Sequence, residues 1–427
     1  MLFRLACFLV LVSLFIPRLT FSGVWVGLED LTILVLGSLA VLVKTQRMTH
    51  LTKPLLPIVI FVSIFAFVGT AQTLSYTGNL SVPTELWQYV KRGIAFLMFA
   101  YVGEFSREQS VKRIGFLFVL VLLGYQAIGF LQIVGGQFGD QISGMYARTD
   151  QQLRLATQST NNRIFGVSGH SNSWGAFSAF SLFAIYGVLS FLRNVRYVKS
   201  VSYYLLLTIG VVLCLVNVYY SRSRGSMLAI SFSILYFLFV LVSYKPARVA
   251  IYVPFSFLAV AFLYWFVSEN IAVFDFIIYR FEVLIEKSGG GRVDQILSAI
   301  RLLELPHEYI FGVSNRVQRF FAVSHGVEVE FVNILVSYGA LGFFLLYFQL
   351  FLLFILFRGK PKLDGSGLSS LKVSARAMIL MYVIFSFGYF FYAELIVGVM
   401  PWAFFGLVYG VLKRVDRSDV KALQYSC

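Results

Sequence analysis

The stretch EFVNILVSYGALGFFLLYFQLFLLFILF, residues 330–357, decides the class of this protein. Its only charged residue is Glu330, and the remainder is long enough to cross a bilayer as a helix, which takes about 20 apolar residues. The whole chain of 427 residues has the same character, because 59% of it is hydrophobic and 13% charged, with a mean hydropathy of +0.80. Soluble domains carry about 25% charged residues. The sequence therefore predicts an integral membrane protein and excludes a soluble enzyme, a disordered chain and a disulfide scaffold.

Apolar runs of similar length recur on both sides of this segment. The first run begins near Arg4 and is not followed by a small-residue cleavage site, so we expect it to be retained as an anchor. The predicted fold is one all-α, polytopic membrane domain over residues 1–427. Its twelve expected spans are 2–16, 22–43, 54–72, 86–105, 114–135, 173–192, 201–220, 225–243, 249–268, 330–357, 374–393 and 396–412.

Lysine and arginine gather in alternate connections between these runs. Cytoplasmic loops of membrane proteins carry such an excess, so these connections and both termini are expected in the cytoplasm. The formal net charge of +15 then reports orientation and not nucleic-acid binding. The basic connections lie near 44–53, 107–113, 193–199, 245–248, 358–376 and 413–421.

Two of the remaining, external connections are long, at 136–172 and 269–329. Loops longer than about 15 residues are more often functional or disordered than idle. The second loop contains near-helical apolar patterns at 274–285 and 293–305, separated by a break at 288–291. We expect two amphipathic helices at the outer membrane interface.

Several cations lie where an anion carried on a membrane lipid would approach. Arginine stays charged and presents a fork of N–H donors matched to phosphate oxygens, so a cluster at the outer ends of spans suits a phosphate or pyrophosphate. The alternative for any one cation is an ion pair with a nearby acid such as Asp30 or Glu330, or contact with lipid headgroups. The candidates are Lys91 and Arg92 in the outer half of a span, Arg163 in the first loop, Arg222 and Arg224 in a turn between spans, and Arg292 and Arg301 in the main loop.

A second group of residues is suited to proton transfer. His325, Glu328 and Glu330 lie where the main loop re-enters the membrane, and burial tunes either side chain toward neutral pH, as a general base requires. The alternative is a cluster at a helix start, where acids are favoured. His170 and Asn172, at the start of the span at 173–192, are further candidate site residues. The alternative for them is a role in capping the helix. The sequence contains neither a metal-ligand spacing nor a nucleotide-binding motif, so no metal and no cofactor is predicted.

The motif Ser221-Arg222-Ser223-Arg224-Gly225 is similar to the serine-arginine turn that opens a span in bacterial O-antigen polymerases and O-antigen ligases. The main loop resembles theirs, since it has an arginine before a helix at Arg292, and then Pro306 followed by Gly312. The spacing from Arg301 to Gly312 matches the Arg-x10-Gly pattern of Wzy-type polymerases. The segment Tyr338-Gly339-Ala340-Leu341-Gly342 resembles the close of the following span, and Arg163, Gly166 and Asn172 resemble an earlier loop.

One departure separates the two kinds of enzyme. The ligases carry a His followed by Asn, Ser or Gln about eleven residues before the glycine, but counting back from Gly339 reaches Glu328, and His325 is followed by Gly326. The resemblance therefore favours a polymerase over a ligase. It implies a GT-C-like, metal-independent glycosyltransferase of lipopolysaccharide or related surface-polysaccharide biosynthesis in the bacterial inner membrane.

The implied substrates are glycans linked to undecaprenyl pyrophosphate, joined on the periplasmic face, with a chain-length regulator and a flippase as expected partners. The first alternative is an O-antigen ligase, which transfers finished polymer to another acceptor. The second is a lipid-linked oligosaccharide flippase or other transporter, for which twelve spans are also typical. A transporter is expected to bury charges near the bilayer midplane, whereas the cations here lie at the outer ends of spans.

Overall fold

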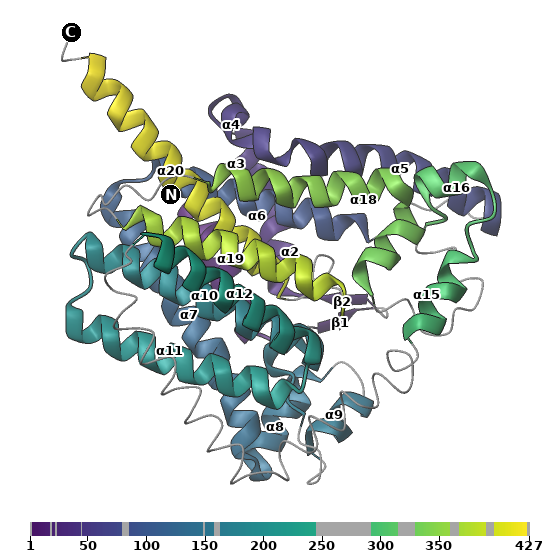
Figure 1. The fold of residues 1–427 in the computed structure, drawn as a ribbon, viewed down its shortest axis with the longest axis horizontal. Coiled ribbons are helices and arrows are strands. Elements are labelled where there is room, and N and C mark those ends of the chain that lie inside the picture. The colour runs from purple at the N-terminus through teal and green to yellow at the C-terminus, as the bar shows by residue number, and fades with distance from the viewer. Residues whose placement is uncertain are drawn as a thin grey trace.

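The computed structural model describes residues 2–17, 19–21, 24–43, 45–78, 85–147, 150–157, 163–244, 292–314, 329–358, 367–389 and 397–424 (Figure 1). The predicted span at 249–268 and the predicted amphipathic helix at 274–285 lie outside these residues.

The described elements are almost all helices. The first third of the chain contains α1 (Leu2–Val12), strands β1 (Leu19–Phe21) and β2 (Val24–Val26), α2 (Leu28–Thr32), a π-helical segment (Ile33–Gly37), α3 (Ser38–Val43), α4 (Thr45–Thr52), α5 (Leu56–Thr77), α6 (Leu86–Phe105) and α7 (Glu108–Val134). The remainder contains α8 (Gly136–Tyr146), α9 (Asp150–Thr157), α10 (Ser171–Asn194), α11 (Ser200–Ser221), α12 (Arg224–Tyr244), α15 (Arg292–Ile300), α16 (Pro306–Phe311), α18 (Glu330–Leu356), α19 (Leu368–Ser386) and α20 (Val399–Gln424).

A helical membrane protein is confirmed. Within the described residues, six helices are long and apolar enough to cross a membrane, namely Thr49–Ser75, Glu108–Val134, Ser171–Asn194, Ser200–Ser221, Glu330–Leu356 and Leu368–Ser386. Helix α6 is of comparable length but contains Lys91, Arg92 and Glu104. The number of twelve spans stays a prediction.

The region predicted as a span at 22–43 differs most from the expectation. Strands β1 and β2 form an antiparallel hairpin in which Leu19 lies opposite Val26, and the helix begins only at Leu28. A π-helical segment then separates α2 from α3. This region is therefore a hairpin followed by a helix that contains a π-helical stretch, although its composition is that of a continuous span.

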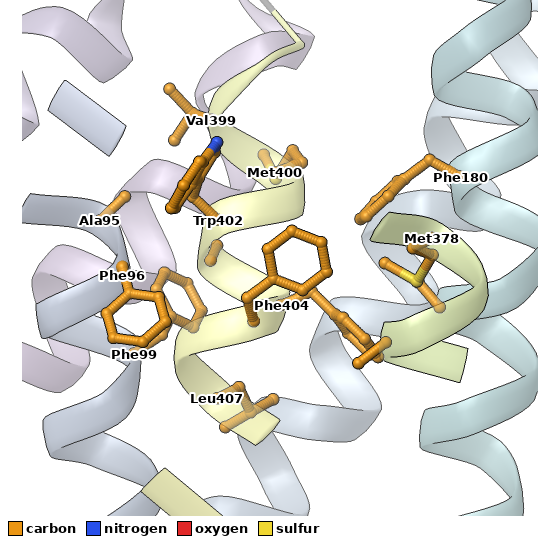
Figure 2. Close-up of a cluster of buried hydrophobic side chains, with 14 of the residues drawn as sticks. Ala95, Phe96, Phe99, Phe180, Met378, Val399, Met400, Trp402, Phe404 and Leu407 are labelled. Atoms are coloured by element: carbon orange, nitrogen blue, oxygen red, sulfur yellow. The ribbon is translucent and has the colours of Figure 1, made fainter. Parts of the chain in front are cut away.

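The centre of the bundle is the contact between α6 and α20. Gly406 and Gly410 of α20 form a G-x-x-x-G pattern, and a Cβ on either would collide with the backbone of Phe96 or Ala100 in α6. Such small residues allow two membrane helices to approach closely. Figure 2 shows the surrounding apolar core, where Phe404 of α20 lies between α6 and the side chains of Phe180 and Met378. The two glycines therefore fix α20 against α6.

One end of the bundle is held by charged groups from both terminal regions. Glu104, whose side chain is 2% exposed, pairs with His50 (2.7 Å) and with Arg417 of α20 (3.2 Å). Six residues after Glu104, the Ser110 hydroxyl at the start of α7 accepts a hydrogen bond from Arg4 (3.0 Å). The start and the end of the chain thus lie at the same end of the molecule, which Figure 1 also shows. The side of the membrane that this end faces stays a prediction.

Candidate functional site

The Ser221–Gly225 turn joins α11 to α12 at the opposite end of α11 from its predicted cytoplasmic start. Arg222 ends α11 in the left-handed region (φ 51°), a conformation that costs a non-glycine residue roughly 1–2 kcal/mol. Serine side chains compensate, since the Ser221 hydroxyl accepts from the Ser223 N–H (3.3 Å) and Ser226 donates to the Ser223 hydroxyl (2.8 Å). Arg222 and Arg224 are both half-buried in this turn. Serine hydrogen bonds therefore brace the backbone of the turn that carries the two half-buried arginines.

Arg163 connects the end of the connection predicted at 136–172 to this turn. Its Nε donates to the Ser221 carbonyl (3.0 Å), and its Nη2 donates to Oδ1 of Asn172 in the first turn of α10 (2.6 Å). The backbone follows the same path, because the Ile164 N–H donates to the Tyr220 carbonyl (3.2 Å). The predicted site residues Arg163 and Asn172 are thus joined to the turn that carries Arg222 and Arg224.

Helix α10 packs closely against the turn. A Cβ on Gly175 would lie 2.7 Å from the Ser226 hydroxyl and 3.0 Å from Cβ of Ser223, so only glycine fits there. Immediately before it, the Trp174 indole donates to Asn217 of α11 (3.0 Å), and Asn217 donates in turn to the Gln126 carbonyl of α7 (2.9 Å). These buried hydrogen bonds tie α7, α10 and α11 together beneath the arginines.

His170, the N-cap residue of α10, contacts Tyr389 beyond the end of α19. The two rings are stacked at 4.7 Å with an interplanar angle of 8°, and the Tyr389 hydroxyl lies 3.1 Å from Nε2 of His170. The sequence does not point to Tyr389 as a site residue, because a tyrosine near the end of an apolar run is typical of the membrane interface. His170 therefore joins a third segment to the site.

The connection predicted at 136–172 forms α8 and α9 before it reaches Arg163. Tyr146, at the end of α8, donates to the Phe15 carbonyl (2.8 Å). Burial raises the pKa of the Tyr146 hydroxyl above its ordinary value, so the group stays protonated as a donor. This bond ties the loop to the N-terminal segment just before the hairpin.

Lys91 forms an ion pair instead of standing as an accessible cation. Its side chain is fully buried, and its Nζ lies 2.7 Å from Oδ1 of Asp30, whose side chain is 14% exposed. Asp30 also accepts from the Gly27 N–H (3.1 Å). Lys91 is five residues into α6, about 8 Å from its start at a rise of 1.5 Å per residue. The ion-pair alternative therefore describes Lys91 better than direct binding of a phosphate.

Arg92 and Glu330 belong to a buried polar group deeper in the bundle. Arg92 is fully buried and donates to the Gln88 carbonyl (2.6 Å), while Glu330, at the start of α18, is 2% exposed. Tyr382 of α19 lies within electrostatic reach of both charged groups. Arg92 and Glu330 thus both act on the same tyrosine in the interior of the bundle.

The two glycine motifs of the main loop and the following span meet. Gly312 (φ 73°) ends α16, and Gly339 (φ 62°) interrupts α18 with a non-helical residue. The chain after Gly312 pairs with the interrupted helix, since the Val313 N–H donates to the Val336 carbonyl (2.9 Å) and the Ser314 N–H to the Ser337 carbonyl (3.0 Å). Segments that are separate in sequence thus form one structural unit.

The helix predicted at 293–305 is shorter than expected. Helix α15 begins at Arg292 and ends at Ile300, and Arg301 is exposed in the turn that follows. A new helix begins at Pro306, because the Glu308 side chain accepts from the N–H groups of residues 304 and 305 (2.7 Å each) and caps it.

Arg301, the arginine of the main loop whose side chain the structure describes, does not join the other arginines. Helix α15 packs against α18, and in the part of the chain that the structure describes no hydrogen bond or ion pair links Arg301 to the turn at Ser221–Gly225. The side chain of Arg292 lies outside the described part. A role for either residue in binding the pyrophosphate stays a prediction.

Two further candidates, His325 and Glu328, lie outside the described residues, as does most of the loop at 269–329. Within the described residues, no three His, Cys, Asp or Glu side chains are grouped so as to hold a metal ion. A comparison with protein-family models finds no match, and a comparison with curated proteins finds no significant match either.

Proposed function

We propose that this protein is a surface-polysaccharide polymerase of the O-antigen type, a glycosyltransferase that joins repeat units linked to undecaprenyl pyrophosphate on the outer face of the bacterial inner membrane. One observation carries the proposal. Arg163 from the first outer loop is hydrogen-bonded to the turn that holds Arg222 and Arg224, so three arginines from two segments lie at one end of the bundle.

This arrangement suits a pyrophosphate leaving group. Negative charge develops on the pyrophosphate as the glycosidic bond breaks, and fixed cations stabilise that charge without having to reorganise. Arg222 and Arg224 are half-buried, which strengthens their attraction for an anion relative to fully solvated side chains. Arginine also offers two parallel donors to one phosphate. The turn is thus a site for a membrane-linked pyrophosphate.

The reaction follows from that placement. The hydroxyl oxygen of an acceptor glycan forms a bond to the anomeric carbon of the donor glycan. The bond from that carbon to the pyrophosphate oxygen breaks, and its electron pair leaves with undecaprenyl pyrophosphate. The acceptor proton passes to a general base, for which His325 and Glu328 stay predictions.

The buried charges have a supporting role in this proposal. Asp30 compensates Lys91 and so ties α2 to α6, while Arg92 and Glu330 both act electrostatically on Tyr382 of α19. Breaking a buried ion pair by removing one partner is strongly destabilising, so the Lys91–Asp30 pair is important for the fold. Lys91 and Arg92 therefore act on the site through the fold, and Glu330 is too enclosed to reach an acceptor hydroxyl.

The contact between Gly312 and the break at Gly339 also supports the proposal. Both glycines belong to motifs that resemble those of O-antigen polymerases and ligases, and the two motifs are in backbone contact. This contact anchors the described part of the main loop, including α15 and α16, at the start of α18. The loop is therefore held against the outer end of the bundle.

A lipopolysaccharide gel of a deletion strain tests the function. Loss of a polymerase leaves single repeat units on the acceptor lipid, whereas loss of a ligase leaves polymer on undecaprenyl pyrophosphate. In the complemented strain, Arg222→Ala is expected to remove long chains while the protein still inserts, and Arg358→Ala, at the other end of α18, is a matched control. Unaltered polymer ladders from Arg222→Ala, or a deletion phenotype of ligase type, would reject the proposal.

A further inference from the structure

The C-terminal end of α19 touches both halves of the arginine site. Gly388 lies beside Gly225 in the first turn of α12, since a Cβ on Gly388 would be in van der Waals contact with Cα of Gly225 (3.4 Å). The next residue, Tyr389, is 6% exposed and stacks on His170 at the start of α10. One short segment thus bridges the serine-arginine turn and the segment that carries Asn172.

Hydrogen bonds at the start of α10 link His170 to Arg163. The His170 carbonyl accepts from the Trp174 N–H (2.9 Å), which starts α10, and its N–H donates to the Ser168 hydroxyl (3.2 Å). Asn172 lies in the first turn of the same helix and holds Nη2 of Arg163 at 2.6 Å. A shift of His170 would therefore move Asn172 and the guanidinium that it orients.

We infer that Tyr389 is a positioning residue for the pyrophosphate site, which it stabilises through His170, Asn172 and Arg163. This inference rests on the proposed function and adds a residue outside the arginine motifs to it. Tyr389 acts in two ways. Its ring stacks flat on the imidazole, and its hydroxyl contacts Nε2 of that imidazole at 3.1 Å.

His170 and Tyr389 are both poorly placed to act on substrate themselves. Nε2 of His170 is engaged by Tyr389, and Nδ1 of the same ring is buried. The Tyr389 hydroxyl is on a side chain with little exposed surface. The pair is therefore a support for the arginines and not the acceptor base.

The test is a double-mutant cycle on the purified full chain in nanodiscs, with inorganic pyrophosphate as the probe. Tyr389→Phe keeps the stacked ring and removes only the hydroxyl, and we expect it to weaken pyrophosphate affinity by about 2-fold to 10-fold, the effect of one neutral hydrogen bond. Arg163→Lys keeps the cation but cannot hold both Ser221 and Asn172. In the Arg163→Lys background, Tyr389→Phe is expected to change the affinity by less than about twofold, because the guanidinium that it positions is already gone.

The control is Tyr203→Phe, which removes a comparable hydrogen bond between Tyr203 of α11 and Ser190 of α10 (3.2 Å). This bond lies toward the ends of both helices that are away from the site. It should leave pyrophosphate affinity unchanged. A merely structural role for Tyr389 predicts the same fold-loss in both backgrounds, and that result would overturn the inference, as would full affinity in Tyr389→Phe. If the unaltered protein fails to bind pyrophosphate, the proposed function falls together with the inference, whereas binding that survives Tyr389→Phe removes the inference alone.

Discussion

Replacement of Gly312 by alanine tests how firmly the main loop is fixed to α18. Gly312 has φ 73° and ψ −170°, a region that is essentially restricted to glycine and costs other residues about 1–3 kcal/mol. A Cβ there would also collide with backbone atoms of Ser337 and Tyr338, which cannot move aside without breaking the pairing of residues 313 and 314. We therefore expect Gly312→Ala to destabilise the protein by about 3 kcal/mol or more.

Two other glycines separate the contributions. Gly78 has φ 68°, but a Cβ added to it would meet no atom of the described residues within 4 Å, so Gly78→Ala carries the conformational cost alone, roughly 1–2 kcal/mol. Gly144 is exposed in α8, has an ordinary helical φ, and has no described atom near the position of an added Cβ. Gly144→Ala should therefore raise the free energy of unfolding by about 0.5–1 kcal/mol. The assay is the midpoint of thermal unfolding in nanodiscs, followed by loss of the monodisperse protein peak. Equal midpoints for Gly312→Ala and Gly78→Ala would refute the close backbone contact.

Two further substitutions test the buried polar groups. Asn217→Leu removes the acceptor of the Trp174 indole and two hydrogen bonds to backbone carbonyls, so it should lower the unfolding midpoint by the equivalent of about 1–2 kcal/mol, and an unchanged midpoint would contradict the interhelical network. Asp30→Asn leaves the fully buried Lys91 without its counter-charge and should cost about 3–5 kcal/mol, whereas Asp30→Asn combined with Lys91→Met should recover most of that loss. The Asp30→Asn single variant and the double variant are compared by yield of folded protein and thermal midpoint. A double variant with no higher yield or midpoint than the single variant would show that the pair is not coupled.

The class of the protein and the position of its cations at the ends of spans follow from the sequence, but the pairings within the site do not. Arg163 and Ser221 are 58 residues apart, and Lys91 and Asp30 are 61 apart. Hydropathy reports that such groups lie at the end of a span, and it contains no information about which partner they meet. From the sequence alone, Asp30 is one of several acids that could form an ion pair with these cations.

Interruptions of helices are equally hidden in the sequence. Residues 330–357 have the composition of an uninterrupted span, yet Gly339 is non-helical because the segment after Gly312 pairs with the residues before it. Glycine is common in continuous membrane helices, so its presence alone does not indicate a break. The hairpin before Leu28 escapes prediction for a similar reason, since alternating and continuous apolar patterns are hard to distinguish in short runs.

Polymerisation by the purified protein tests the proposed glycosyltransferase activity directly. The unaltered full chain in nanodiscs is supplied with repeat units linked to undecaprenyl pyrophosphate, and chain length is measured on a gel together with released undecaprenyl pyrophosphate. We predict a ladder of joined units, one lipid pyrophosphate released for each bond formed, and loss of both with Arg222→Ala. Movement of intact lipid-linked units across vesicles without any joining would contradict the proposed function.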